Sequence, residues 1–331
     1  MNYAEELEIR QNMLRSDVCP DFSDGITLRL ELSNICNHKC LCCPNSKMKR
    51  KRCHMPSELV YRLLKEGEEL GIKEVGLFIA GEPFVSPELE DYIKFAKEHS
   101  YEYVFITTNG ALATPARLEK VIDAGIDSIK FSINAGTRES YKVVHGRDDY
   151  DKVFEHLKHA DQYRKRKNAK VKLMTSFVVT KYTKDEIDMH YNKILPYVDD
   201  ICFFNAESFG GQMEEEIKEL RVKIDNDKMP QYTIPNKIPC VELFKTICVT
   251  AEGFMTCCCS EAFNYLVVED VNSMLLREAW HSESMQNIRR RHIEGNIDGT
   301  QCYKCIYGKE KGKTEPLNKE LYIKSLDENK E

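Results

Sequence analysis

Residues 36–43 read Cys36-Asn37-His38-Lys39-Cys40-Leu41-Cys42-Cys43, and this short run carries more information than any other part of the chain. Its cysteines at 36, 40 and 43 are spaced so that one loop can bring three thiolates to one metal centre. Three thiolates can hold three corners of a cubane iron–sulfur cluster, which leaves the fourth iron without a protein ligand. Because four cysteines normally close such a cluster, the run favours chemistry at an open iron over electron storage.

Two other interpretations of this run remain open. A zinc knuckle requires CxxC-like pairs or added histidines, and His38 and His54 supply only a weak version of that pattern. Buried free thiols are the second alternative. Cys42 could also compete with Cys43 as a ligand, although the spacing favours Cys43. The iron–sulfur interpretation is the one that the spacing favours.

Composition favours a cytoplasmic enzyme. The chain has 331 residues, 14 cysteines and a formal net charge of -6. No N-terminal apolar run resembles a signal peptide or a transmembrane helix, so we expect the cysteines to bind metal and not to form disulfides. The negative charge argues against a nucleic-acid partner, and no membrane partner is expected. The basic tract at residues 47–52 is expected to be a solvated loop that could meet an acidic or phosphorylated substrate.

Strand-like and helix-like segments alternate regularly from residue 26 to residue 207. This alternation predicts parallel βαβ units and an α/β fold class. Six repeats suggest an open, partial barrel, although a flat doubly wound sheet has the same pattern. In either fold, ligands are expected at the C-terminal ends of the strands. The expected strands are residues 26–32, 74–80, 103–108, 128–134, 171–180 and 200–207, with helices at 57–70, 87–99, 114–125, from 135 to about 166, and at 184–195.

The spacing of Cys36, Cys40 and Cys43 resembles the pattern of the radical SAM superfamily. One departure is Cys42, which stands where that superfamily usually has an aromatic residue. The resemblance implies a partial (β/α)6 barrel, a [4Fe–4S] cluster on the three cysteines, and S-adenosylmethionine bound to the open iron. It also implies reductive cleavage of S-adenosylmethionine to a 5′-deoxyadenosyl radical that abstracts hydrogen from a substrate.

Polar residues at the expected strand ends supply the cofactor site that the resemblance implies. Ala80-Gly81-Glu82-Pro83 is similar to the superfamily's GGEP motif, which would place Gly81, Glu82 and Pro83 near the methionyl amine. Asn109 ends the third strand, where short side chains leave room for a ligand. By the same resemblance Ser132 and Asn134 are placed near the ribose, and Val179 near the adenine. Without the resemblance, each of these is an ordinary residue of a strand-end turn.

A second cysteine system occupies the C-terminal third of the chain. A CxxC pair with two earlier cysteines gives four thiolates, enough for a closed [4Fe–4S] cluster or a structural zinc site. The layout resembles the twitch and SPASM extensions of radical SAM enzymes, with Gly253 in a hairpin turn and Trp280 in a helix at 275–291. Because no cysteine follows Cys305, we expect the shorter twitch form with one cluster. Matching the pattern outward from Gly253 selects Cys240, Cys258, Cys302 and Cys305, with Cys257 and Cys259 as rivals of Cys258 and Cys248 as a core thiol.

These features divide the chain into five expected parts. They are an N-terminal extension at 1–25, the radical SAM partial barrel at 26–207, a linker at 208–239, a small cysteine-rich α+β domain for the auxiliary cluster at 240–308, and a charged, loosely held tail at 309–331.

The layout is similar to that of 2-deoxy-scyllo-inosamine dehydrogenase, and three functions compete. The favoured one is a radical SAM oxidoreductase acting on a small polar molecule (a sugar, aminocyclitol or nucleoside), with the auxiliary [4Fe–4S] cluster as electron acceptor and a flavodoxin or ferredoxin as reductant. Epimerisation or decarboxylation would use the same layout. The second is a peptide-modifying maturase, which would need a recognition domain larger than residues 1–25 can form. The third is a non-enzymatic zinc protein. The catalytic base is unassigned, with Tyr141, His145, Arg147 and Glu207 as candidates by location alone.

Overall fold

The computed structural model describes residues 17–22, 25–222 and 238–327. These residues are organised around one continuous sheet of nine strands, in the order β6-β5-β4-β3-β2-β1-β7-β8-β9. Within the same ranges, no helix is both long and apolar enough to cross a membrane.

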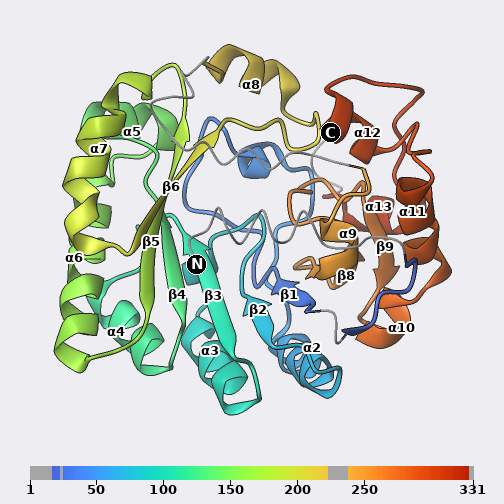
Figure 1. Ribbon diagram of the computed structural model, residues 1–331, viewed down its shortest axis with the longest axis horizontal. Coiled ribbons are helices and arrows are strands. Elements are labelled where there is room, and N and C mark those ends of the chain that lie inside the picture. Colours follow the sequence, from blue (N-terminus) through green and yellow to red (C-terminus); the bar gives the residue numbers. More distant parts are fainter. Residues whose placement is uncertain (1–16, 23–24, 223–237, 328–331) are drawn as a thin grey trace.

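Six parallel strands form the first and larger part of the sheet. Each pairs in parallel with the next one along the chain, as expected for βαβ units. Figure 1 shows this part curving, with helices along its outer side, so that it forms an open barrel. The predicted α/β class and partial barrel are therefore confirmed. The strands are β1 (Thr27–Leu30), β2 (Glu74–Gly76), β3 (Tyr103–Thr108), β4 (Ser128–Ser132), β5 (Lys172–Val179) and β6 (Asp200–Asn205).

The helices between these strands pack one apolar face against the sheet. In α2, Leu59, Val60, Leu63 and Leu64 are all buried, and this spacing places them on one side of the helix. Gly146 interrupts the long helical region predicted up to residue 166, because its left-handed φ of 65° ends α5 there. The helices are α2 (Ser57–Glu69), α3 (Leu89–Glu98), α4 (Pro115–Asp123), α5 (Arg138–His145), α6 (Tyr150–Lys167) and α7 (Ile187–Ile194).

The second strand is shorter than predicted. Its pairing with β3 ends at Leu77, whose N–H donates to the carbonyl of Phe105 at 3.0 Å. Beyond that point the chain turns toward β1, where the N–H of Ala80 donates to the carboxylate of Glu31 at 3.1 Å. The segment after β2 is thus a strand-end turn held by a buried side chain.

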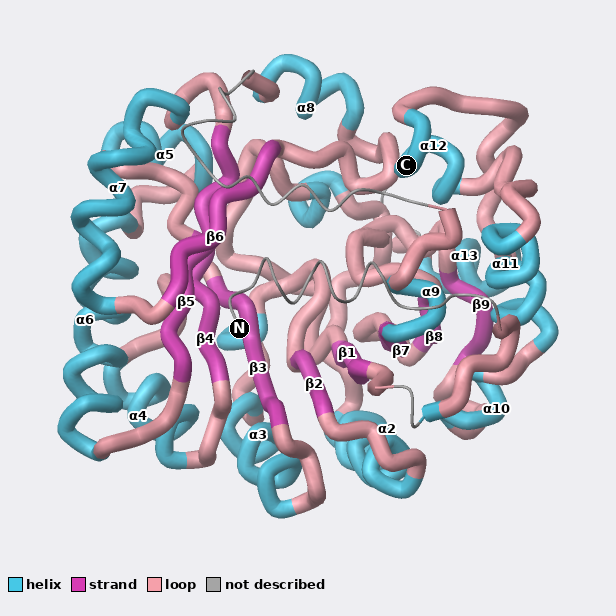
Figure 2. The backbone as a smooth tube through the Cα atoms, in the orientation of Figure 1, coloured by secondary structure: helices cyan, strands magenta, loops and turns pink. Residues whose placement is uncertain are grey.

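The cysteine-rich part extends the same sheet. The strand β7 (Thr246–Val249) pairs in parallel with β1, and β8 (Phe254–Thr256) and β9 (Val267–Asp270) follow it as antiparallel strands. Figure 2 shows these three strands next to β1. Gly253 has a φ of 84° in the turn between β7 and β8, where the sequence predicts a tight hairpin. The remaining helices are α8 (Glu214–Leu220), α9 (Glu242–Lys245), α10 (Leu276–Trp280), α11 (Glu283–Ile293), α12 (Gln301–Tyr307) and α13 (Lys319–Ser325).

The region expected to be one helix at 275–291 is two helices, α10 and α11. Ser282 separates them and begins α11, because its hydroxyl accepts a hydrogen bond from the N–H of Met285 at 3.2 Å. Trp280 ends α10 and is fully buried, and its indole N–H donates to the carbonyl of Pro20 at 3.2 Å. The described part of the N-terminal extension therefore packs on the cysteine-rich part.

The basic tract and the tail are more tightly held than the sequence predicts. Arg50 is fully buried between the carboxylates of Glu31 and Glu252, so it is not part of a solvated loop. The backbone N–H of Lys51 donates to the carbonyl of Ser325 at 2.8 Å. The tail also forms α13, which contacts β9, and its Leu321 is buried. Burial and backbone pairing thus hold two segments whose charge suggested solvent exposure.

Candidate functional site

The loop that carries the first three cysteines follows β1 and contacts the end of α5 and the turn after β2. The N–H groups of Lys39 and Leu41 donate to the carbonyls of His145 and Val144, at the end of α5. On the other side, the Asn45 amide donates to the carbonyl of Ala80 at 2.8 Å. Nothing in the local sequence singles out Asn45, since a polar residue after a proline is typical of any turn. The loop is therefore held between the turn after β2 and the end of α5.

The three predicted cysteines are brought together by this loop. Burial is the main cause that raises the pKa of Cys36 to about 12 and that of Cys43 to about 11, and it raises the pKa of Cys40 as well. Thiolates at Cys43 and Cys36 would each raise the pKa of Cys40 further, so these groups lie near one another. Metal binding replaces the thiol protons and balances the thiolate charge, so the donor set fits an iron–sulfur cluster.

A buried hydroxyl beside this loop also lacks a partner. The Tyr141 hydroxyl has no hydrogen-bond partner among the described residues, and the Tyr141 ring is fully buried. Burial and then Cys40 are the main causes that raise its pKa. An unpaired donor near the three cysteines fits a site that takes an acceptor-rich group.

Cys42 lies in a different environment from its neighbours. It packs in a hydrophobic cluster with Met213, Ile217 and Leu220, beneath α8. Burial raises the pKa of its thiol to about 11. Cys42 is thus one of the apolar contacts between the cysteine loop and α8.

The Gly81-Glu82-Pro83 turn lies directly against this loop. A Cβ at Gly81 would overlap the carbonyl oxygen of Ser33, so the two backbones are in close contact. The carboxylate of Glu82 is 2% exposed and accepts hydrogen bonds from the N–H groups of Phe84 and Asn109 and from the hydroxyl of Thr108. Burial raises its pKa to about 7, and these donors oppose that shift. Glu82 therefore joins the β2 and β3 ends, and its expected contact with an ammonium stays a prediction.

Of the remaining strand-end residues, Asn109 contacts the cysteine loop, whereas Ser132 and Asn134 contact β5. The Asn109 amide donates to the Asn37 side chain at 2.8 Å and lies 3.7 Å from the sulfur of Cys36, so this residue reaches the cysteine loop. Ser132 is half-buried and its hydroxyl accepts from Ser176 at 3.3 Å. The Asn134 side chain accepts from the N–H of Val178 at 2.8 Å and joins β4 to β5.

Val179 is buried, and its expected place near the adenine stays a prediction. Val179 is 1% exposed and belongs to the main hydrophobic core. Side chains alternate along a strand, so Val178, which is partly exposed, points to the opposite face. Val178 is therefore the side chain of this pair that faces away from the main core.

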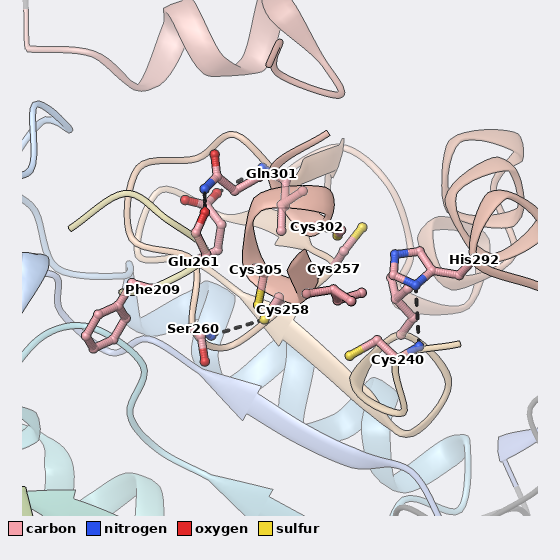
Figure 3. Close-up of a pocket in the computed structure, with 14 residues that line it drawn as sticks. Phe209, Cys240, Cys257, Cys258, Ser260, Glu261, His292, Gln301, Cys302 and Cys305 are labelled. Carbon is pink, nitrogen blue, oxygen red and sulfur yellow. Dashed lines mark hydrogen bonds between the residues drawn. The ribbon is translucent and has the colours of Figure 1, made fainter. Parts of the chain in front are cut away.

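The C-terminal cysteines lie around a cavity, and Figure 3 shows their side chains there. The space in it that no protein atom fills is about 490 Å³, which includes solvent at its open side. Cys302 and Cys305 stand three positions apart on α12, which places both on one face of that helix. The thiols of Cys240 and Cys258 reach the same cavity from the start of α9 and from the loop after β8. The predicted set of four cysteines is thus assembled around one space.

Burial favours the protonated form of these thiols when no metal is bound. Burial is the largest cause that raises the pKa of Cys240 to about 12 and that of Cys305 to about 11, and it raises the pKa of Cys302 as well. His292 lines the cavity, and its buried Nε2 has no hydrogen-bond partner among the described residues. An unpaired ring nitrogen beside four thiols fits a site for a group absent from the protein alone.

The rivals of Cys258 differ in what they contact. Cys257 also lines the cavity, but it is 1% exposed and its thiol donates to the sulfur of Met285 at 3.7 Å. Cys259 donates to the carboxylate of Glu242 at 3.7 Å and is absent from the cavity lining. Cys248 is fully buried in β7, as expected of a core thiol. The contacts favour Cys258, while the ligand assignment stays a prediction.

The four candidate bases also occupy different environments. Tyr141 and His145 are fully buried against the first cysteine loop, whereas Arg147 is exposed. Burial and then His38 are the causes that lower the pKa of His145 to about 3. Glu207 follows β6 and keeps solvent contact, yet partial desolvation raises its pKa, and a thiolate at Cys259 would raise it further. Among the four, Glu207 combines solvent contact with nearness to the second cysteine system.

The fold is an open parallel barrel with a three-thiol loop after its first strand, and a cavity lined by four further thiols adjoins it. This combination defines a class of iron–sulfur enzymes. Two family models match this chain, the radical SAM superfamily over residues 30–194 and the iron–sulfur cluster-binding domain SPASM over residues 240–306. The chain belongs to the radical SAM superfamily and carries a C-terminal SPASM domain.

Membership of this family confirms the predicted types of cofactor. The two domains imply a [4Fe–4S] cluster, bound S-adenosylmethionine and an auxiliary iron–sulfur cluster. The boundaries of the predicted domains and the twitch form with one auxiliary cluster stay predictions. The expected linker contains α8, and its residues 223–237 lie outside the described ranges.

Two curated relatives with similar sequences carry the same name. A probable GTP 3′,8-cyclase of Saccharolobus islandicus is 26% identical over 225 residues, which is 63% of this chain and 71% of the relative. A probable GTP 3′,8-cyclase of Metallosphaera sedula is 28% identical over 240 residues, which is 66% of this chain and 72% of the relative.

Solved structures with the same fold include enzymes with different ligands. BtrN in complex with AdoMet and 2-DOIA is 17% identical, with a TM-score of 0.56 over 86% of this chain and 92% of that chain. SuiB of Streptococcus suis bound to the precursor peptide SuiA is 15% identical, with a TM-score of 0.62 over 86% of this chain and 69% of that chain. The enzyme anSMEcpe with AdoMet and the Kp18Cys peptide is 15% identical, with a TM-score of 0.61 over 90% and 94% of the chains. At these identities the likeness shows a shared fold.

Proposed function

We propose that this protein is a radical SAM oxidoreductase that removes hydrogen from a small polar substrate such as a sugar, an aminocyclitol or a nucleoside. Cys36, Cys40 and Cys43 hold the [4Fe–4S] cluster that binds S-adenosylmethionine. Cys240, Cys258, Cys302 and Cys305 hold one auxiliary [4Fe–4S] cluster. The observation that supports the proposal most is the gathering of four thiols around one cavity at the edge of the barrel.

Four thiol ligands determine whether the auxiliary cluster can bind substrate or only accept an electron. A cluster with a protein thiolate on every iron has no free position for a substrate, but it can accept an electron. When bound, the first cluster and S-adenosylmethionine supply the radical that takes a hydrogen atom from the substrate. The substrate must then lose one electron and one proton to complete a two-electron oxidation. The auxiliary cluster is the proposed electron acceptor.

Glu207 is the proposed acceptor of the substrate proton. It keeps solvent contact at the end of β6, next to the second cysteine system. A carboxylate with a raised pKa is a stronger base than an ordinary one, so its position and its basicity both suit this role. The reductant that supplies the first electron is proposed to be a flavodoxin or ferredoxin.

Two other substrate classes have some support. The names of the curated relatives favour GTP and a cyclisation. Two of the solved structures contain peptides, which favours a peptide substrate. A screen that includes GTP, peptides, sugars and aminocyclitols therefore tests all three classes, with substrate-dependent formation of 5′-deoxyadenosine as the first readout. The mass of the product then separates oxidation, which removes two hydrogen atoms, from cyclisation without net oxidation.

The iron and sulfide content of anaerobically reconstituted protein tests the cluster assignment. We expect about eight irons in the wild type and about four after Cys36, Cys40 and Cys43 are replaced together by Ala, because each cubane holds four irons. Cys202→Ala is a matched control, since Cys202 is a fully buried core thiol on β6. About four irons in the wild type would remove the electron acceptor from the proposal. Zinc in place of iron would overturn the radical mechanism.

A further inference from the structure

His145 connects the end of β4 to the first cysteine loop through its two ring nitrogens. On one side, Nε2 lies 3.1 Å from the backbone nitrogen of Asn134. On the other side, Nδ1 lies 3.4 Å from the sulfur of Cys40. His145 therefore joins a strand end of the expected cofactor site to a proposed cluster ligand, and this inference rests on the ligand assignment proposed above.

The tautomer of His145 follows from these two contacts. A backbone N–H can only donate, so Nε2 must accept the hydrogen bond from Asn134. An imidazole that accepts at Nε2 carries its proton on Nδ1. The proton on Nδ1 therefore lies between this nitrogen and the sulfur of Cys40, and a thiolate bound to iron can only accept it.

The surrounding side chains hold the ring in this orientation. The ring of Tyr141 stacks on it with centroids 4.0 Å apart and an angle of 14°. The ring of His38 meets it edge-on at 5.5 Å, and His38 is itself held by the carboxylate of Asp149 at 3.2 Å. His145 is fully buried, so no water competes for its nitrogens.

The backbone next to His145 is held to the same loop. The carbonyl of His145 accepts from the N–H of Lys39 at 3.2 Å. Gly146, which ends α5, lies so close to the loop that a Cβ there would stand 2.9 Å from the carbonyl oxygen of Lys39. The backbone that carries the imidazole is therefore fixed relative to the loop that carries Cys40.

We propose that His145 is a positioning residue whose Nδ1–H hydrogen bond to Cys40 sets the reduction potential of the [4Fe–4S] cluster that binds S-adenosylmethionine. Reduction adds negative charge to the cluster and its sulfurs, and a hydrogen-bond donor to one of those sulfurs stabilises the reduced form. Removal of the donor makes reduction harder. The same ring links Asn134 to the cluster, so the ligand-binding strand end and the metal site are held in one geometry.

The test is a potentiometric titration of the intact, reconstituted enzyme, following the reduced-cluster signal that the triple replacement of Cys36, Cys40 and Cys43 abolishes. His145→Phe keeps a flat ring against Tyr141 but has no N–H. We expect its ratio of reduced to oxidised cluster at a fixed potential to be about tenfold lower, equivalent to about 59 mV for one electron. His145→Asn places an amide nitrogen near the position of Nδ1 and is expected to restore most of the wild-type potential.

His190→Phe is the matched control. His190 is a buried histidine of the same barrel, and its Nδ1 donates to the carbonyl of Ala135 at 3.2 Å. This variant is expected to keep the wild-type potential. Equal potentials in His145→Phe, His190→Phe and the wild type, with iron retained in all three, would overturn the role of His145. A protein in which the triple cysteine replacement removes no cluster would instead overturn the ligand assignment.

A measurement on the wild type covers the case in which His145→Phe does not retain iron. The backbone N–H of His38 donates to the sulfur of Cys36 at 3.4 Å, so the 15N label must be confined to the imidazole rings of histidine. Protein labelled in this way is expected to show a nitrogen coupling in the electron spin echo of the reduced cluster, and this coupling weakens in His145→Asn because its amide is unlabelled. A wild-type spectrum without that coupling would contradict the hydrogen bond.

Discussion

Cys42 and Cys43 are adjacent in the chain but have different surroundings. Both lie near Cys40, but Cys42 packs against Met213, Ile217 and Leu220, whereas Cys43 also lies near Cys36. A turn at residues 41–42, closed by the hydrogen bond from the N–H of Cys43 to the carbonyl of Cys40, places Cys42 against the residues of α8. Spacing alone favours Cys43, and the packing of α8 supplies a physical reason for that choice.

Replacing each of these cysteines separately by Ala tests the assignment at this scale. Cys42→Ala is expected to keep about eight irons and to lose about 1 kcal/mol of stability through the small cavity it leaves. Cys43→Ala is expected to lose about four irons, because three thiolates hold the first cluster. Iron and sulfide analysis after anaerobic reconstitution is the measurement. The reverse result, with iron lost from Cys42→Ala alone, would make Cys42 the ligand.

His190 makes the stability of the protein depend on pH. Burial is the main cause that lowers its pKa to about 4 from an ordinary 6.5. Between these two values the unfolded chain binds a proton that the folded protein does not, so the free energy of unfolding falls as pH falls through this window. We expect a loss of about 2 kcal/mol between pH 7 and pH 5 from this residue.

Anaerobic urea denaturation of the wild type and of His190→Phe at both pH values measures this contribution. The variant is expected to lose about 2 kcal/mol less than the wild type over the same interval, since Phe does not titrate. An equal loss in both proteins would mean that other groups account for the pH dependence.

At the scale of elements, the ends of β2, β3 and β4 form one edge around the first cysteine loop. Glu82 joins the β2 and β3 ends, Asn109 reaches Cys36, and His145 joins the β4 end to Cys40. The C-terminal ends of parallel strands meet at one edge of a sheet, and for this reason the strand-end residues could be predicted from sequence. The contacts among them depend on side-chain directions, as the buried Val179 illustrates.

Gly81→Ala is expected to disturb this edge. A Cβ at this position would overlap the carbonyl oxygen of Ser33, so the β2-end turn and the cysteine loop would have to separate. We expect a loss of about 1–3 kcal/mol of stability, as is usual for overpacking, and at least tenfold weaker binding of S-adenosylmethionine. Isothermal titration of the reconstituted protein with S-adenosylmethionine measures the affinity.

Gly71→Ala is the control for that experiment. A Cβ at Gly71 meets nothing within 4 Å, although its φ of 77° makes any side chain unfavourable there. We expect a stability loss of about 1 kcal/mol and no change in affinity. Equal affinities in both variants would show that the contact at Gly81 has no effect on the cofactor site.

At the scale of the whole molecule, buried charges join the barrel to the cysteine-rich part. Arg50 contacts Glu31, which follows β1, and Glu252, which lies in the turn between β7 and β8. Burial opposes the charge of Arg50, but the two carboxylates outweigh it and raise its pKa. Together with the pairing of β1 with β7, this cluster sets the position of one cysteine system relative to the other.

Glu252→Gln removes one carboxylate from this cluster. We expect the free energy of unfolding to fall by about 3 kcal/mol, because a buried arginine loses part of its charge compensation. The control is Glu216→Gln, since Glu216 pairs with Lys47 at the surface and such a pair contributes about 1 kcal/mol or less. Anaerobic urea denaturation compares the two variants. Equal losses would mean that the buried cluster contributes no more than a surface ion pair.

The sequence by itself determined the α/β class and the two cysteine systems, whereas the choice of a partial barrel over a flat sheet came from the family resemblance. Strand and helix periodicity depends on which residues are apolar, and metal ligands on one loop or one helix turn are recognised by their spacing. These are local properties, so they are readable without the fold. The strand-end positions of Gly81, Asn109 and Ser132 follow from the same pattern.

The tertiary structure alone decided what depends on contacts between distant segments. It pairs β7 with β1, buries Arg50 from a tract that looks solvated, and holds the charged tail against residues 49–51. It also places one ring nitrogen of His145 next to the backbone nitrogen of Asn134 and the other next to the sulfur of Cys40. Such contacts join residues far apart in sequence. They depend on side-chain direction and packing, and neither of these produces a periodic pattern in the sequence.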